Sequence, residues 1–362
     1  MLKGLDFTNP LLGVLMRFRK CLVAFSCDVE KMFFQFAVPE SDRDYLRFLW
    51  WPNGDFTVEP QEYRMTVHLF GAASSPGCAN YGLRLLAKDH LQSTPRGSRF
   101  VSQDFYVDDG LTSVNTVESA IELALDAKRI CKSGGLRLHK FVSNSTALLE
   151  ALPSEDCATS PQFGISSLEG VLGLRWCPAS DELQFRVSSD TQKETRRGLL
   201  STVASVFDPT GLVAPFVLVG KKILQEVCVR KTGWDDALED DLKPRWESWR
   251  DDLTSLQNLK VPRCFHTPNF VPVKVELHHF SDASNSGYGQ CSYVRLINAA
   301  GNVQCALVFA KSRVAPIKIV TIPRLELTAA VVSARASVLL KSELRYESAE
   351  HFFWTDSKVV LG

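Results

Sequence analysis

Two adjacent carboxylates, Asp108 and Asp109, constrain this chain more than any other feature of its sequence. They follow a Tyr-Val dipeptide and precede Gly110, and both flanking segments, 98–105 and 111–114, favour β-strands. The Asp-Gly dipeptide is a typical hairpin turn. Two like charges at the tip of a hairpin repel each other unless water or cations neutralise them. The pair is therefore either a solvated turn or part of a cation site.

A third carboxylate, Asp28, ends an apolar run that begins at Leu22 and is typical of a buried strand. Mg²⁺ in proteins takes oxygen ligands and usually keeps water or substrate phosphate as the others. Asp28, Asp108 and Asp109 together would make a site for two Mg²⁺ (or Mn²⁺) ions that performs phosphoryl transfer. One ion would lower the pKa of an attacking 3′-hydroxyl, and the other would hold the triphosphate and the leaving oxygen.

The composition limits the kind of protein that these carboxylates can serve. Of 362 residues, 45% are hydrophobic, so the chain can bury a core and is long enough for two or three domains. Lys plus Arg and Asp plus Glu both number 41, so any nucleic-acid surface must be a local patch. The ten cysteines form no Cys-x-x-Cys pair, which favours reduced thiols over zinc ligands. No apolar run reaches the ~18 residues of a membrane span, and the N-terminus is not a secretory signal, so we expect a cytoplasmic protein with no membrane partner.

Three motifs, in order, resemble the palm of a retroelement reverse transcriptase. They are residues 25–36 around Asp28, residues 70–76 (Phe-Gly-Ala-Ala-Ser-Ser-Pro) and residues 106–109 (Tyr-Val-Asp-Asp). A fourth stretch, residues 134–144, is similar to a segment typical of the BEL/Pao class of long-terminal-repeat retrotransposons. The chain thus resembles part of a BEL/Pao-type polyprotein over most of its length. The resemblance implies DNA synthesis from deoxynucleoside triphosphates on an RNA template, with a virus-like particle as one cytoplasmic setting.

The same resemblance implies roles for four residues around the substrate. Phe33 would be the steric gate that excludes a ribose 2′-hydroxyl, although an aromatic within the segment 33–36 is also a natural core residue. Phe70 and Gly71 would lie beneath the template and the incoming base, where Gly71 lets the backbone approach closely. Lys140 would be a cation that faces the triphosphate, or else a solvated lysine.

A second series of acids follows in the last third of the chain. Asp282 ends a strand-like run that begins at Glu276, Glu326 lies in the first turn of an expected helix, and Asp356 ends another strand-like run. The order of these elements and acids resembles a ribonuclease H domain. The resemblance implies two further metal ions that activate water against the RNA of an RNA/DNA hybrid. Taken alone, each acid is more naturally a helix cap or a surface group.

The expected fold class is α+β / α/β, a reverse-transcriptase palm and thumb followed by a ribonuclease H-like domain. We expect the palm at 1–150 with the fingers largely missing, and a thumb or connection (Pao-type region) at 151–270. A ribonuclease H-like domain at 271–362 would lack its C-terminal part. The alternative function is that of a catalytically inactive nucleic-acid-binding remnant or a domesticated scaffold.

Three further segments carry local expectations. Residues 45–51 and 56–58 favour a hairpin that belongs to the core. Residues 191–260 favour basic helices, which either track a phosphate backbone or form a solvated surface. Residues 208–211 (Asp-Pro-Thr-Gly) lack the uninterrupted Asp-Thr-Gly of an aspartic protease and occur once, so we interpret them as a turn.

Overall fold

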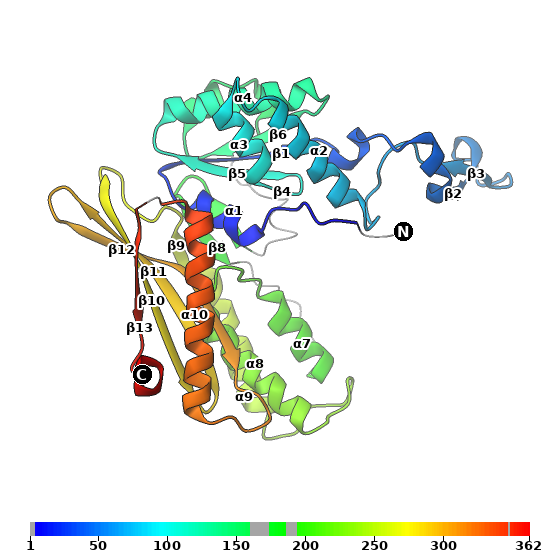
Figure 1. Ribbon diagram of the computed structural model, residues 1–362. Helices are drawn as coiled ribbons and strands as arrows, with labels where there is room; N and C mark the ends of the chain where they lie inside the picture. Colours follow the sequence, from blue (N-terminus) through cyan, green and yellow to red (C-terminus); the bar gives the residue numbers. More distant parts are fainter. Residues whose placement is uncertain (1–3, 160–173, 186–193, 347) are drawn as a thin grey trace. The chain divides into compact units, whose positions relative to one another are not determined.

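The computed structural model describes residues 4–159, 174–185, 194–346 and 348–362 (Figure 1). The chain forms two compact units, each of which draws on separate stretches of sequence. Unit 1 is built from Met1–Pro10, Phe25–Thr112 and Thr116–Ala158, and unit 2 from Leu11–Ala24, Ser113–Asn115 and Thr159–Gly362. The predicted domain boundaries, after residues 150 and 270, stay predictions. No helix in the described ranges is long and apolar enough to cross a membrane.

A four-stranded sheet, in the order β4-β5-β1-β6, lies at the centre of the described part of unit 1. Its strands are β1 (Val23–Val29), β4 (Phe105–Tyr106), β5 (Asp109–Val114) and β6 (Leu138–Ser143). The helices are α2 (Ser75–Asp89), α3 (Pro95–Gln103), α4 (Val117–Ser133) and α5 (Thr146–Glu150). The rings of Phe25, Phe100, Phe105 and Phe141 are buried and pack with centroids 5.1 to 6.2 Å apart. This aromatic core holds β1 between its neighbours.

The segment before the two carboxylates is not the predicted strand. Residues 95–103 form helix α3, and only Phe105–Tyr106 are extended, because the helix buries Phe100 and Val101 on one face. The packing of these residues thus outweighs the local preference of the segment for a strand. The hairpin turn also lies two residues earlier than predicted, since Tyr106 pairs with Asp109 and leaves Val107 and Asp108 in the turn, with Val107 at φ +58°. Gly110 lies in the strand, where a Cβ atom would meet the ring of Phe105 at 2.6 Å.

The hairpin predicted for the core lies on the surface instead. Strand β2 (Arg47–Trp50) pairs with β3 (Gln61–Arg64), so the returning strand is not 56–58. Both strands are exposed along their whole length, and the side chains of Tyr45 and Phe56 are 77% and 69% exposed. Aromatic and β-branched residues favour strands whether or not the strand is buried, which is why composition alone misplaced this hairpin.

Unit 2 contains a second four-stranded sheet, in the order β12-β11-β10-β13, among its described residues. Strands β10 (Pro272–Ser284), β11 (Gly287–Asn298) and β12 (Val303–Val314) form an antiparallel meander, and β13 (Glu350–Trp354) is parallel to β10. Helix α10 (Ile322–Leu344) packs along β10 and β11, as Figure 1 shows, and buries Ala336 and Leu340 against Leu277 and Val294. The short α11 (Lys358–Leu361) follows β13.

The rest of unit 2 is mostly helical. Helix α1 (Leu11–Phe18) belongs here although it directly precedes β1, and it is followed by α7 (Arg196–Ser205), α8 (Ala214–Val229) and α9 (Lys243–Leu253). A small sheet joins β7 (Leu174–Cys177), β8 (Glu182–Phe185) and β9 (Lys260–Pro262). Residues 160–173 and 186–193 lie outside the described residues, and the second range includes the start of the segment 191–260 that the sequence predicts to form basic helices.

The two local expectations within this helical part have different outcomes. Residues 208–211 form a turn, as predicted, and the Asp208 carboxylate accepts hydrogen bonds from the backbone N–H groups of Leu212 and Val213. Acidic side chains neutralise part of the positive charge of the basic stretch 191–260, since Arg230 pairs with Glu226, Glu239 and Asp241. Such pairing leaves less positive charge for a phosphate backbone. The phosphate-tracking role stays a prediction.

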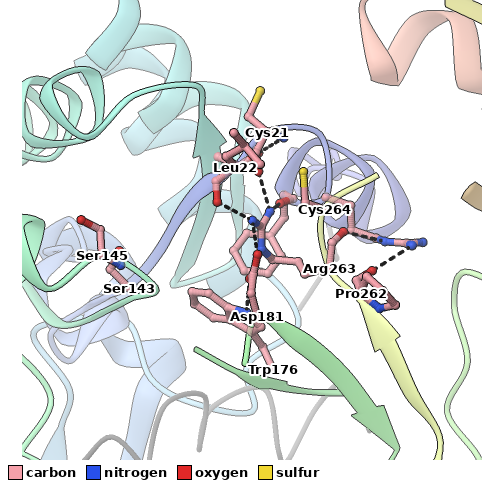
Figure 2. A network of polar contacts seen from close by, with 12 residues as sticks. Cys21, Leu22, Ser143, Ser145, Trp176, Asp181, Pro262, Arg263 and Cys264 are labelled. Carbon is pink, nitrogen blue, oxygen red and sulfur yellow. Dashed lines mark hydrogen bonds and ion pairs between the residues drawn. The ribbon is translucent and has the colours of Figure 1, made fainter. Parts of the chain in front are cut away.

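A fully buried arginine ties distant parts of unit 2 together (Figure 2). The Arg263 guanidinium donates to both carboxylate oxygens of Asp181, at 2.6 and 2.8 Å. Its remaining donors reach the backbone carbonyls of Phe18, Cys21 and Leu22, at 2.6 to 2.9 Å. A guanidinium has five N–H donors and no acceptor, so these bonds satisfy it almost completely. The arginine thereby joins the α1–β1 connection to the β7–β8 hairpin and β9.

Replacement of Arg263 by Met should lower the free energy of unfolding by about 3 kcal/mol or more, because it leaves Asp181 and three carbonyls without their donor. Urea unfolding, followed by the fluorescence of buried tryptophans, measures the loss. Arg197→Met is the matched control, since Arg197 pairs with Asp235 on the exposed surface and should leave the urea midpoint unchanged. Equal midpoints for the two variants would contradict this role of Arg263.

Candidate functional site

Unit 1 brings two of the predicted carboxylates next to each other. Asp28 is buried near the end of β1, and Asp108 lies in the turn between β4 and β5. The backbone N–H of Val29 donates to the carbonyl of Asp108 at 3.0 Å, so the strand runs directly beside the turn. Burial raises the pKa of the Asp108 carboxyl, and the negative charge of Asp28 raises it further. Asp28 and Asp108 therefore form a carboxylate pair that a cation would stabilise.

Asp109, the third predicted ligand, begins β5 and is buried. Burial raises the pKa of the Cys27 thiol, and the charges of Asp28 and Asp109 raise it further, so Asp109 lies near this thiol and Asp28 beside it. In the part of the chain that the structure describes, no three His, Cys, Asp or Glu side chains converge as a ready metal cage. A pair of carboxylates still fits Mg²⁺, which completes its shell with water and substrate phosphate.

The Asp28 carboxylate has two basic partners on β6. The His139 Nε2 lies 2.7 Å from Asp28 Oδ1, and the Lys140 Nζ lies 3.4 Å from Oδ2. The Lys140 side chain is 56% exposed, whereas that of His139 is 18% exposed. The structure thus places Lys140 beside a predicted metal ligand, with more than half of its side chain in solvent. Sequence reasoning missed His139, although it directly precedes Lys140.

The predicted substrate residues form a small aromatic group. Phe33 is buried in a 3₁₀ turn (Met32–Gln35) that follows β1, and its ring meets the exposed ring of Phe70 edge-on at 4.8 Å. The ring of Phe34 also meets that of Phe70 edge-on, at 5.5 Å. Gly71 has φ +85°, a backbone conformation that favours glycine, and a Cβ there would meet nothing within 4 Å. Phe33, the predicted gate residue, and Phe70 therefore lie together.

The second series of acids lies at one end of the unit 2 sheet. Phe280 of β10 is the register partner of Trp354 of β13, so Asp282 and Asp356 follow at equivalent places on parallel neighbouring strands. Both line a cavity of about 670 Å³, together with side chains such as Tyr288. Parallel strands deliver their carboxyl ends to the same edge of a sheet, which explains how residues far apart in sequence meet here.

Glu326 does not line this cavity but is linked to the end of β13 through Ser357. It lies in the first turns of α10, and its carboxylate accepts a hydrogen bond from the hydroxyl of Ser357. Ser357 is buried and directly follows Asp356. Its hydroxyl links α10 to the end of β13 and thereby fixes Glu326 beside the chain that carries Asp356. Sequence reasoning did not single out Ser357, and the only signal for it was its position after the acid.

A row of buried polar side chains lies between this sheet and α10. The fully buried His279 of β10 bonds to Ser292 Oγ at 2.8 Å and to His351 at 3.1 Å, and His351 bonds to Ser337 of α10 at 2.7 Å. Burial lowers the pKa of His279 to about 4, helped by the nearby imidazoles. The row was invisible in the sequence, because His279 lies in an otherwise ordinary strand pattern.

Comparison with known families shows what this chain is similar to. Residues 195–357 match the family described as the Pao retrotransposon-like RNaseH-like domain, and this range includes Asp282, Glu326 and Asp356. The resemblance to BEL/Pao-type retroelements is confirmed. No curated protein matches the chain.

Solved structures extend the likeness to unit 1. The chain is similar to the foamy viral protease-reverse transcriptase in complex with RNA/DNA hybrid, with a TM-score of 0.56 and 16% identity over 98% of its length. A second structure of that protein, with double-stranded DNA, gives a TM-score of 0.57 and 15% identity over 99%. The chain spans only 41% and 54% of those two chains.

These likenesses confirm the expected fold class, a mixed α and β chain with a reverse transcriptase fold and a ribonuclease H-like domain. The fold and the family match together indicate a retroelement region that has a reverse transcriptase fold and a ribonuclease H-like domain. The roles of the individual acids, of Phe33, Phe70 and Gly71, and of Lys140 stay predictions.

Acidification should destabilise unit 2 through His279. The folded state keeps this imidazole neutral down to about pH 4, whereas an unfolded histidine takes up a proton near pH ~6.5. The unfolded state therefore binds more protons between these values, and the free energy of unfolding falls by up to about 1.4 kcal/mol per pH unit. The melting temperature between pH 7 and 4.5 measures the effect.

His279→Gln should flatten this pH dependence, because it removes the group that titrates only on unfolding. His266→Gln is the matched control, since His266 lies near the surface and bonds only to a neighbouring carbonyl in the described structure. The control should keep the slope of the native protein. An unchanged slope in His279→Gln would assign the acid sensitivity to other groups.

Proposed function

We propose that the chain is an RNA-directed DNA polymerase segment of a retroelement polyprotein, with a ribonuclease H-like domain. The observation that carries the proposal is the pairing of Asp28 with Asp108, supported by the 3.0 Å hydrogen bond from the backbone N–H of Val29 to the carbonyl of Asp108 and by the raised pKa of Asp108. Two desolvated carboxylates of like charge are costly unless they bind a cation. The fold of reverse transcriptases supports the same reading of unit 1.

Some residues of unit 1 would bind the cations, and others would bind the substrate. Asp28, Asp108 and Asp109 would hold divalent ions, Mg²⁺ or Mn²⁺, which when bound activate a 3′-hydroxyl and stabilise the leaving pyrophosphate. Phe33 would pack under the sugar of a deoxynucleoside triphosphate, with Phe70 and Gly71 beneath the base. The exposed ammonium of Lys140 would attract the triphosphate.

Unit 2 would receive the product duplex of that reaction. Asp282 and Asp356 line one cavity, and Glu326 is held beside them by Ser357, which supports a metal-dependent site for hydrolysis of RNA. The solved relatives bind an RNA/DNA hybrid and double-stranded DNA, and we propose that this chain binds an RNA template and RNA/DNA hybrid as well. The contrasting possibility is a nucleic-acid-binding remnant without catalysis.

Asp28→Asn and Asp108→Asn should each reduce primer extension on an RNA template by at least about a hundredfold, because each removes one charge of the pair. Extension with Mg²⁺ and deoxynucleoside triphosphates measures the loss. Glu59→Gln, an exposed acid at the far end of the β2–β3 hairpin, is the control and should extend like the native chain. Hybrid binding without any extension by the native chain would favour the remnant instead.

Phe33→Ala should admit ribonucleotides by opening space beside the sugar. The expected result is a drop of about 10- to 100-fold in the preference for deoxy- over ribonucleoside triphosphates, with smaller effects on deoxynucleotide incorporation. Single-nucleotide extension with each triphosphate measures the ratio. Phe34→Ala is the matched control, because Phe34 is exposed, whereas Phe33 is buried, and its loss should leave the ratio unchanged. An unchanged ratio in Phe33→Ala would make Phe33 a core residue.

A further inference from the structure

Two consecutive side chains of β6 reach the same carboxylate. His139 Nε2 contacts Oδ1 of Asp28 at 2.7 Å, and Lys140 Nζ contacts Oδ2 at 3.4 Å. Successive side chains of a regular strand point to opposite faces of the sheet. A regular β6 could therefore present only one of the two residues to Asp28, so some irregularity must turn the other toward it.

That irregularity is a β-bulge opposite Cys27. Ser26 pairs with Val142 and Asp28 pairs with His139, so Lys140 and the next residue both oppose Cys27. Lys140 adopts φ +52°, a left-handed conformation that a residue with a Cβ atom rarely takes. Bulges of this kind are common beside active sites, where they redirect a side chain. The packing around the bulge must compensate for its strain.

The core residue after the bulge supplies part of that compensation. Phe141 is buried and packs against the ring of Phe25 at 6.2 Å, and Val142 is buried beside it. The extra residue thus lets β6 keep its apolar side chains in the core while His139 and Lys140 both face Asp28. Sequence periodicity alone would have sent these two residues to opposite faces.

The two contacts differ in chemical character. An ionised carboxylate accepts hydrogen bonds and donates none, so His139 Nε2 carries the hydrogen and donates it to Oδ1. The imidazole is also mostly buried, with two side-chain torsions to restrain it. Lys140 is more exposed, more flexible and farther away. His139 therefore fixes one oxygen, while Oδ2 has the looser partner.

We propose that His139 is a positioning residue for Asp28, held in place by the bulge at Lys140. Its N–H bond to Oδ1 fixes the orientation of the carboxylate and leaves Oδ2 for a divalent cation. Hydrogen bonds to a ligating carboxylate typically change metal affinity by 10- to 100-fold. The proposal rests on the proposed function, because it takes Asp28 as a metal ligand.

Binding of Mn²⁺ without nucleotide or nucleic acid tests the proposal, with free Mn²⁺ measured by electron paramagnetic resonance. His139→Leu removes the donor and should weaken binding by about tenfold or more. His139→Gln places an amide N–H near the position of Nε2 and should restore affinity to within about threefold of the native value. His139→Asn carries the same amide as His139→Gln on a side chain that is one bond shorter. It should therefore bind Mn²⁺ as weakly as His139→Leu, although its side chain is as polar as that of His139→Gln. Thermal melting of each variant reports its folding.

Two controls separate the possible outcomes. His90→Leu makes the same substitution at a histidine that bonds to Ser133 instead, and it should bind Mn²⁺ like the native chain. Asp28→Asn should abolish the site. If native binding survives in His139→Leu but not in Asp28→Asn, the positioning role is wrong and the proposed function stands. If the native chain binds no better than Asp28→Asn, the proposed function itself fails. Equal weakness of the Gln and Leu variants would also overturn the positioning role.

Discussion

The bidentate pair between Arg263 and Asp181 is the interaction on which much of unit 2 depends. It lies where the helix before β1, the β7–β8 hairpin and β9 meet, and its guanidinium also donates to three backbone carbonyls. Such a pair adds little stability compared with apolar packing, but loss of either partner is expensive. Its value is geometric: it fixes the point at which the chain enters the strand that carries Asp28.

The two groups of acids differ in burial. In unit 1, Asp108 lies beside the buried Asp28 with its pKa raised, and the bulge on β6 brings two basic side chains to Asp28. In unit 2, the acids lie at an open end of a sheet, and a serine hydroxyl orients Glu326. The second arrangement leaves Asp282 and Asp356 accessible to solvent and to a large ligand.

The order of motifs predicted the fold class and the neighbourhood of the acids, because strand ends and turn residues leave strong local signals. It could not predict the helix at Pro95–Gln103, where tertiary packing of Phe100 overrides a strand-like composition. It also could not predict the approach of His139 to Asp28, because a one-residue bulge reverses the alternation on which such reasoning relies. The prediction that the β2–β3 hairpin belongs to the core was wrong for a third reason, since aromatic residues favour strands on surfaces and in cores alike.

The same hairpin affects how the protein behaves in concentrated solution. In the described structure β2 and β3 form a two-stranded ribbon, and unpaired strand edges are templates for association between molecules. Charged side chains lie along it, with Arg47 paired to Glu62 and Arg64 to Asp44. Charges on an edge oppose such association, but exposed ion pairs are screened by salt. Solubility should therefore depend on ionic strength, and the apolar rings of this ribbon are where molecules would first adhere.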